Sequence, residues 1–292
     1  FLRHAYARDS GEGKPAQIPA VIWSFWNDPG GPRVPAHPKD LASWVKYRLE
    51  NAFRGNASNS TGAGELEPLV KLSVESWRKL NPEYEIRILD LDSYQRWLGP
   101  EDLPRTFERL EVAHKADALR IAVLAKYGGV WIDATGLMLV PLRKVLGADR
   151  LHRAFVATWR ADLEKRDKRV DWKYYVENAF FAAPANDTLV TQVKDCFSRA
   201  HSELAGAFTL RPLSDMGLFS RQQLEEMEGL GIDSSYLTMH ACFFKALDED
   251  AGAKRSFDGP WTRLVEGSRG LFPHLWVLGK DVWPDLLLRD RR

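Results

Sequence analysis

The sequence contains little cysteine and no long apolar run. Only two of its 292 residues are cysteines, Cys196 and Cys242. They lack the spacing of a metal knuckle or a redox pair and permit at most one internal disulfide, with two free buried thiols as the alternative. No run approaches the roughly 20 apolar residues that cross a membrane, and no signal peptide is recognisable. The printed sequence therefore contains neither a membrane span nor a cysteine-based metal site.

An excess of either charge is also absent. Lysine and arginine number 41, against 40 aspartates and glutamates, so no overall field would attract nucleic acid or an anionic membrane surface. Any anionic ligand must be held by local groups. The chain is 45% hydrophobic and 28% charged, which is an ordinary globular composition. Its length allows one large α/β domain or two small ones.

Two features bear on the cellular compartment. Residues 1–17 are polar and are predicted to form a tail or stem. Sequons for N-glycosylation begin at Asn56, Asn59 and Asn186, where chance predicts roughly one. Since the chain starts at Phe1 without an initiator methionine, we expect a type II protein of the Golgi or secretory lumen, with membrane association only through an anchor before this residue. A cytoplasmic protein with meaningless sequons is the alternative.

Alternating strand and helix signals predict an α/β fold. Short connections between them argue for a Rossmann-type, mostly parallel sheet covered by helices on both faces, followed by a less regular carboxyl-terminal part. Residues 236–244 are apolar and interrupted by a histidine, with no element assigned. The expected strands are 18–26, 84–89, 130–133, 154–159 and 178–183, and the expected helices are 41–49, 69–80, 113–127, 188–201 and 221–228.

The most informative feature is a pair of motifs joined by two glycines. Asp117 and Arg120 stand three residues apart and therefore share one helix face. Gly128 and Gly129 end that helix, and the strand that follows ends at Asp133, where ligands of parallel sheets gather. Asp117 can accept hydrogen bonds from ribose or sugar hydroxyls, and Arg120 can grip a phosphate or carboxylate. An ordinary ion pair within the helix is the alternative.

Asp133 closes an apolar strand. A carboxylate there would be costly to bury unless it were paired or bound to a metal, so it is either a cation ligand or a helix cap. A divalent ion at this position could bridge the two phosphates of a nucleotide diphosphate. It would then neutralise charge that grows as a glycosidic bond breaks.

Taken together, the motifs resemble the capsular polysaccharide synthesis protein family, which is allied to the DXD-containing glycosyltransferase family 32. The resemblance spans residues 18–245 and implies a GT-A-like fold over one domain, 18–292. In that domain 18–150 would bind the nucleotide sugar and 151–292 would face the acceptor. The shared residues are Ile18-Pro19, Ile22-Trp23, Trp77 before Asn81-Pro82-x-Tyr84, A-D-x-x-R, and Y-G-G-V-W-I-D-A-T.

The same resemblance implies an activity and a donor site. It implies transfer of a sugar, with retention of configuration, from a UDP- or GDP-sugar to a glycan, lipid or protein, assisted by Mn²⁺ or Mg²⁺. Asp117 would contact the donor's ribose or sugar. Arg120 would contact its diphosphate or the transferred sugar, and Asp133 the metal or the donor sugar. Trp23 or Trp26 would stack on the base.

The family pattern is incomplete at the metal. Where family 32 carries Asp-x-Asp, this chain has Asp133-Ala134-Thr135, and threonine is a weaker, neutral ligand. Asp133 with His240 could still hold Mn²⁺, which accepts imidazole, so we predict manganese over magnesium. A core histidine satisfied by a carbonyl is the alternative for His240. The family further implies that Asn178 lies near the donor, and Glu177 beside it is a candidate acid or nucleophile.

Several function classes follow from this interpretation. The first is an active retaining glycosyltransferase, which Asp117, Arg120 and Asp133 favour. The second is a non-catalytic sugar- or nucleotide-binding protein with a degenerate DXD motif, and the third is a nucleotide-sugar hydrolase. A Rossmann dehydrogenase is disfavoured because no G-x-G-x-x-G follows an expected strand.

Overall fold

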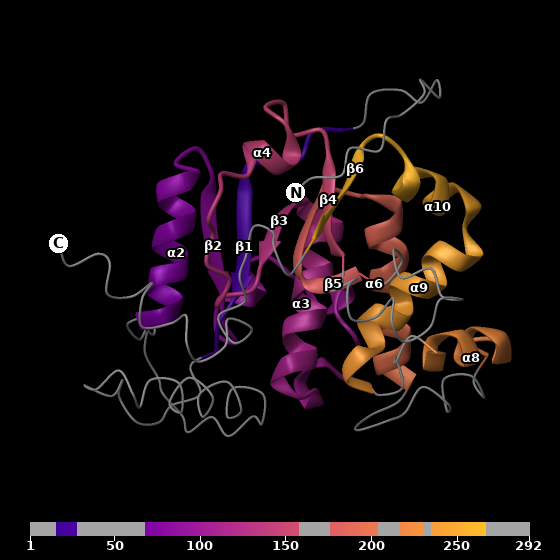
Figure 1. The fold of residues 1–292 in the computed structure, drawn as a ribbon. Coiled ribbons are helices and arrows are strands. Elements are labelled where there is room, and N and C mark those ends of the chain that lie inside the picture. The colour runs from indigo at the N-terminus through magenta and orange to yellow at the C-terminus, as the bar shows by residue number, and fades with distance from the viewer. Residues whose placement is uncertain (1–15, 28–67, 158–175, 204–216, 230–234, 267–292) are drawn as a thin grey trace, which may run out of the picture.

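A computed structural model describes residues 16–27, 68–157, 176–203, 217–229 and 235–266 (Figure 1). The helix expected at 41–49 and the sequons at Asn56 and Asn59 lie outside them. No helix within these ranges is long and apolar enough to span a membrane. The strands are β1 (Val21–Phe25), β2 (Glu85–Leu89), β3 (Gly129–Ile132), β4 (Arg153–Ala157), β5 (Val176–Ala183) and β6 (Thr262–Glu266). The α-helices are α2 (Pro68–Leu80), α3 (Val112–Tyr127), α4 (Arg143–Leu146), α6 (Thr188–Glu203), α8 (Arg221–Gly229), α9 (Thr238–Glu249) and α10 (Ala251–Asp258).

The strands form one mixed sheet in the order β2-β1-β3-β5-β4-β6. β1 pairs in parallel with both β2 and β3. β5 is antiparallel to β3 and to β4, and β6 is again parallel to β4. The predicted α/β class is therefore confirmed, and the flanked sheet is consistent with a GT-A-like fold. The change of direction at β5 was not predicted.

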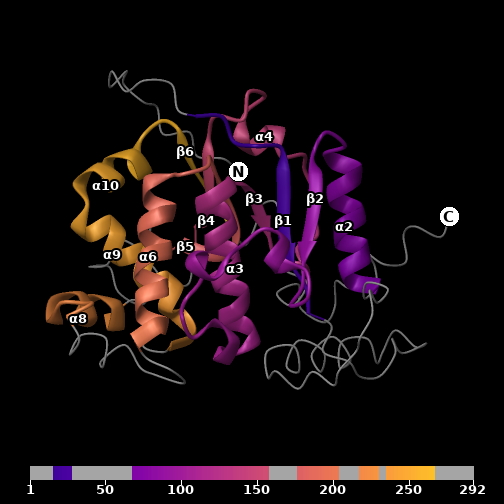
Figure 2. The same ribbon diagram turned by 180° about the vertical axis from the view of Figure 1, so that it is seen from behind.

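Alternate residues along each central strand face opposite sides of the sheet. Trp23, Trp131 and Phe181 belong to a core that also contains buried residues of α3, α6, α9 and α10. In Figure 2 the helices α3 and α6 lie in front of the sheet. The period-two alternation of a strand thus divides the apolar side chains between two layers.

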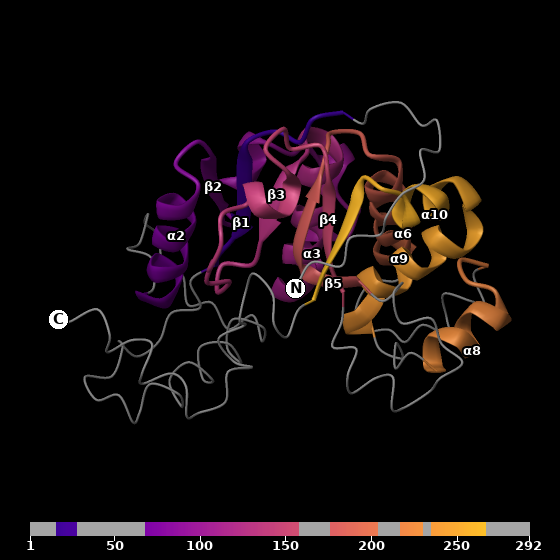
Figure 3. The same ribbon diagram turned by 45° about the horizontal axis from the view of Figure 1, so that its top comes forward.

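The second core covers the opposite face of the sheet. It contains Ile22, Ile132 and Phe180 from the strands, together with buried residues of α2 and α4. Figure 3 shows α2 at one end of the molecule and α8 and α10 at the other. The prediction of a sheet covered on both faces is confirmed.

The reversal of β5 decides which residues meet at the edge of the sheet. Ile132, the last residue of β3, pairs with Phe180 in β5, and the amide of Asp133 donates to the carbonyl of Ala179 across 3.0 Å. The start of an antiparallel strand lies beside the end of its partner. Glu177 and Asn178 are thereby placed at the edge where β3 ends.

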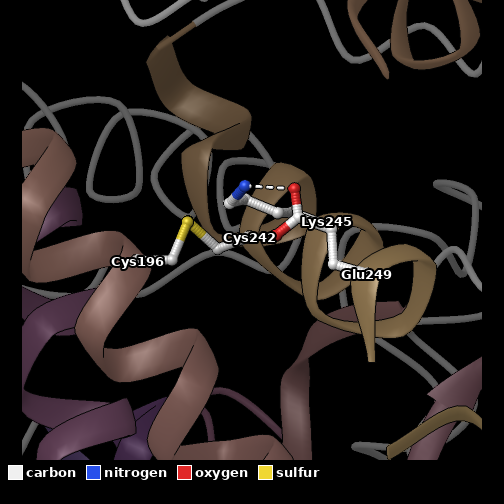
Figure 4. Close-up of a disulfide and its surroundings, with 4 residues drawn as sticks. All are labelled: Cys196, Cys242, Lys245 and Glu249. Atoms are coloured by element: carbon white, nitrogen blue, oxygen red, sulfur yellow. Dashed lines mark hydrogen bonds and ion pairs between the residues drawn. A yellow bond between two sulfur atoms is a disulfide. The ribbon is translucent and has the colours of Figure 1, made fainter. Parts of the chain in front are cut away.

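A disulfide joins two helices that pack on the first core. Cys196 of α6 and Cys242 of α9 are bonded, with their Cα atoms 5.7 Å apart (Figure 4). Both residues are buried. Of the two alternatives that the sequence left open, the structure thus contains the disulfide, and it fixes α9 against α6 two residues after His240.

Candidate functional site

The centre of the site is an arginine buried between two carboxylates. Asp117 and Arg120 lie in a stretch of α3 that is buried on all sides, and Arg120 Nη1 donates to Asp117 Oδ1. Arg120 Nη2 donates to Asp133 Oδ1 across 2.7 Å. The two motifs recognised in the sequence therefore form one cluster, and the expected ion pair within α3 is one of its parts.

The two glycines between these motifs allow the cluster to form. Gly128 and Gly129 have φ angles of 65° and 109°, which glycine adopts readily. A Cβ atom at Gly128 would lie 2.4 Å from the amide nitrogen of Ala185, and one at Gly129 would lie 2.7 Å from the carbonyl oxygen of Val21. Glycine at both positions lets β3 start directly after α3, so Asp133 emerges beside Arg120.

Asp133 is oriented by a second donor that was not predicted. Trp131 Nε1 donates across 2.8 Å to the same oxygen, Oδ1, that Arg120 holds. The other oxygen, Oδ2, accepts no hydrogen bond from the described residues. The Asp133 side chain is 35% exposed. One oxygen is thus fixed by the protein and the second is available to a ligand.

Strand β5 supplies the other polar groups. Asn178 Nδ2 donates to Asp117 Oδ1 across 3.0 Å, so the predicted site residue touches the cluster. Glu177 Oε2 lies 3.7 Å from Nε2 of His240, which comes from α9 and is buried. The structure therefore brings together Asp117, Arg120, Asp133, Asn178, Glu177 and His240, all from the predicted set.

The charges of the site do not balance. Burial raises the pKa of Asp117, although Arg120 opposes this effect. Burial also acts to lower the pKa of Arg120, but Asp133 and Asp117 outweigh it and raise the pKa. Two carboxyl groups contact the one guanidinium, and Glu177 adds a third carboxyl group to the site. The site therefore favours hydroxyl donors and cations over bare anions.

One of the two roles predicted for Arg120 does not fit this arrangement. Both of its terminal nitrogens point to carboxylates of the protein, to which they donate. A bidentate grip would require the same two nitrogens to face the diphosphate. Arg120 instead holds Asp117 and Asp133 in place.

Trp23 does not fit the predicted role of a base-stacking platform. Its side chain is fully buried, its ring contacts Trp97 and Tyr127, and its Nε1 donates to the Gly128 carbonyl across 2.9 Å. Because the ring packs inside the first core, it presents no face to a donor base, and this prediction is wrong. The apolar run of β1 is equally typical of a core strand, so the sequence could not separate the two roles.

The donor-binding roles of Trp26 and Thr135 stay predictions. Trp26 follows the carboxyl end of β1 and is partly buried, and its Nε1 makes no hydrogen bond with the described residues. Thr135 is half-buried in the turn that the Gly136 amide closes on the Asp133 carbonyl across 2.7 Å. Both lie at the edge of the sheet where β1 and β3 end.

A metal ligand set is only partly present. The described residues contain no group of three or more histidine, cysteine, aspartate or glutamate side chains that could hold a metal. The free oxygen of Asp133 is nevertheless of the type that Mg²⁺ and Mn²⁺ bind, and ions shared with substrate phosphates often take only one or two protein carboxylates. Asp133 thus fits such an ion, and His240, which lies beside Glu177, remains a predicted ligand.

An exposed tyrosine near the cluster was not given a role by the sequence. Tyr236 lies in η5 (Ser235–Leu237), directly before α9, and is 54% exposed. Desolvation of its hydroxyl, followed by the charges of Asp117 and Asp133, raises its pKa to about 12. The phenol is therefore a neutral group that lies near the carboxylates.

Most of the site lies within a range of the chain that matches a known family. Residues 61–203, just under half of the chain, match the capsular polysaccharide synthesis protein family. This range includes the cluster residues of α3, β3 and β5. The resemblance seen in the sequence motifs is thereby confirmed over this range.

Two named proteins are similar to the chain. The O-glycosyltransferase PaGT of Phomopsis amygdali is 28% identical over 97 residues, which are 29% of this chain and 24% of that protein. The chain thus matches about a quarter of this relative's length. Among solved structures, the PaToxG glycosyltransferase is similar with 14% identity and a TM-score of 0.39, over 85% of this chain and 86% of that one.

Proposed function

We propose that the protein transfers a sugar from a nucleotide-diphosphate donor to a hydroxyl of a glycan, lipid or protein, with retention of configuration. The observation that carries the proposal is the Asp133 carboxylate. One of its oxygens is held by Arg120 and Trp131, and the other has no protein partner among the described residues. The family match and the similarity to glycosyltransferases support the same reaction class.

The charge of the site supports metal dependence. A diphosphate carries negative charge, and so do the carboxylates that outnumber Arg120 here. Both terminal nitrogens of Arg120 point to protein carboxylates, so a cation would offset the repulsion between donor and protein. Asp133 would hold Mn²⁺ or Mg²⁺, with Thr135 and His240 as additional proposed ligands. When bound, the ion neutralises charge that develops on the diphosphate as the glycosidic bond breaks.

The donor sugar would lie against Asp117. Asp117 Oδ1 accepts from both Arg120 and Asn178, while Oδ2 accepts no hydrogen bond from the described residues. A second carboxylate oxygen fixed in direction is suited to accept a bond from a sugar or ribose hydroxyl. Asn178 then has a positioning role, and Trp26 is the remaining proposed contact to a UDP or GDP base.

Glu177 is the proposed acid or nucleophile of a retaining reaction. Its side chain is 28% exposed and lies beside His240. It can therefore reach a ligand while the contact with His240 keeps it oriented. It also adjoins Asn178 in β5, beside the residues that would hold the donor. A carboxylate in this position can act on the sugar or on the acceptor hydroxyl.

A calorimetric titration tests the proposal. The protein is titrated with a panel of UDP- and GDP-sugars in the presence of Mn²⁺ and again with EDTA, and donor hydrolysis is followed by NMR. We expect metal-dependent binding, with slow hydrolysis that releases the retained anomer. Metal-independent sugar binding without hydrolysis would indicate a binding protein instead. Rapid turnover without an acceptor would indicate a nucleotide-sugar hydrolase.

We also propose that the protein works in the lumen of the Golgi or secretory pathway. The Cys196–Cys242 disulfide supports this compartment because disulfides persist in oxidising environments. The sequon residue Asn186 is exposed between β5 and α6. Expression in a secretory host should give a protein whose mass falls after endoglycosidase treatment. An unglycosylated protein with two free thiols would instead support the cytoplasm.

A further inference from the structure

Tyr236 is one of two large apolar side chains that are exposed in the described part of the chain. It is 54% exposed, and Leu139 is 52% exposed. A single exposed apolar residue is common on protein surfaces and needs no explanation by itself. The position of Tyr236 relative to the carboxylates is what distinguishes it.

Two observations place Tyr236 at the site. It lies in η5, the 3-10 turn that leads directly into α9, four residues before His240. His240 in turn lies 3.7 Å from Glu177 in β5. Burial of its hydroxyl, and then the nearby charges of Asp117, Asp133 and Glu177, raise the pKa of Tyr236.

The surroundings of Tyr236 combine two kinds of surface. Its ring offers an apolar face to solvent, and the carboxylates of Asp133 and Glu177, near its hydroxyl, offer hydrogen-bond acceptors. A pyranose ring has the complementary pattern, with C–H groups on its faces and hydroxyls around its rim. Binding sites commonly pair one aromatic surface with a few polar groups that set the orientation of the ligand.

We infer that Tyr236 is a stacking platform for a pyranose ring that lies over Asp133 and Glu177. This inference rests on the proposed function and adds a residue that determines how the sugar is held. The pyranose is either the donor's sugar or the terminal sugar of the acceptor, since both offer the same C–H face. The ring of Tyr236, rather than its hydroxyl, supplies the contact.

Three variants of the full chain test the inference. Tyr236→Ala removes the ring, and Tyr236→Phe keeps the ring but removes the hydroxyl. Leu139→Ala is the matched control, because it removes an equally exposed apolar side chain. For each protein, KM for hydrolysis of the nucleotide sugar that the wild type uses is measured with Mn²⁺. Inhibition by methyl glycosides reports the acceptor sugar, and affinity for UDP and GDP reports the nucleotide.

We expect Tyr236→Ala to weaken one of the two sugar measurements by roughly five- to tenfold, as loss of one aromatic stacking contact would. A rise in donor KM assigns the platform to the donor's sugar, and weaker glycoside inhibition assigns it to the acceptor. Tyr236→Phe and Leu139→Ala should stay within about twofold of the wild type. Affinity for UDP and GDP should not change in any variant.

Three results would overturn the inference and leave the proposed function intact. These are a Tyr236→Ala variant with wild-type sugar constants, a Tyr236→Phe variant as impaired as Tyr236→Ala, and a loss confined to the free nucleotides. In contrast, a wild-type protein that binds and hydrolyses no nucleotide sugar would overturn the proposed function together with the inference.

Discussion

Two arginines among the described residues are buried against carboxylates, one near the end of β3 and the other at the start of β4. Arg120 lies near the carboxyl end of β3, between Asp117 and Asp133. Arg153 begins β4, where its Nη1 donates to Asp187 across 2.9 Å and its Nη2 donates to the hydroxyl and carbonyl of Ser256.

The two clusters differ in charge and in exposure. Arg153 faces one carboxylate, and Asp187 is 5% exposed in its side chain, so the pair is neutral and closed. Arg120 faces two carboxylates, one of which is 35% exposed. A closed pair joins elements of the fold, whereas an open cluster with excess negative charge has capacity left for a ligand.

The largest expected effect tests the open cluster. Asp133→Asn keeps the size of the side chain and an oxygen for Arg120 and Trp131, but removes the charge that would hold the cation. We expect kcat/KM for transfer or donor hydrolysis to fall at least about 1000-fold, the scale of losing a key electrostatic contact. Thermal unfolding should remain near that of the wild type. Near-native activity in the purified variant would show that the site is assigned wrongly.

At the closed pair of Arg153 and Asp187 we expect a loss of stability without a loss of activity. Asp187→Asn leaves the buried guanidinium of Arg153 without a counter-charge, which costs roughly 3–5 kcal/mol of unfolding free energy. Urea denaturation measures this loss, and activity per folded molecule should not change. Asp92→Asn, at an exposed aspartate, serves as the control with little effect. If Asp187→Asn reduced activity more than stability, the two clusters would not have separate roles.

The buried residue His201 tests how far the core of the protein tolerates a charge. His201 at the end of α6 is fully buried. Burial, and then the neighbouring His114, lowers its pKa from 6.5 to about 3. Because the unfolded chain takes up a proton that the folded one refuses, stability is lost as the pH falls below 6.5. The loss is at most about 2 kcal/mol by pH 5. Urea midpoints at pH 7 and pH 5 should differ less for His201→Phe, and an unchanged difference would contradict this explanation.

The smallest expected effect separates orientation from packing. Trp131→Phe removes the N–H that fixes Asp133 and leaves Arg120 as its only described donor. We expect kcat/KM per folded molecule to fall about tenfold, the value of one hydrogen bond to a charged group. Trp23→Phe is the control, since it removes a buried indole bonded to a backbone carbonyl. It should lose similar stability and keep its activity. Equal losses of activity in both variants would point to packing alone.

Local patterns in the sequence predicted a large part of the fold. The apolar spacing of 69–80 and 113–127 matches α2 and α3 closely. The helix expected after Asp187 begins there, with Asp187 Oδ1 accepting from the Val190 amide across 3.2 Å. The grouping of Asp117, Arg120 and Asp133 followed from one helix, two glycines and one strand. Each of these signals depends on neighbours within a few residues.

Other features depend on contacts between distant segments and could not be predicted in this way. Residues 238–243 of α9 are all buried, so this part lacks the two-sided pattern that identifies a surface helix. Packing across the sheet sets the direction of β5, the position of Arg120 between two carboxylates and the position of Tyr236. Asn178 was found only through family resemblance, because no local pattern marks it.

The hydrogen bond from the Asp133 amide to the Ala179 carbonyl has a consequence for how activity arises during folding. Asp133 and Asn178 belong to segments that meet only when β5 pairs with β3. A chain in which only β1, β2 and β3 had paired would still lack the Asn178 side chain, whose Nδ2 donates to Asp117. The proposed activity would therefore appear only once β5 pairs with β3, so an assay for it would report the correct pairing of these two strands.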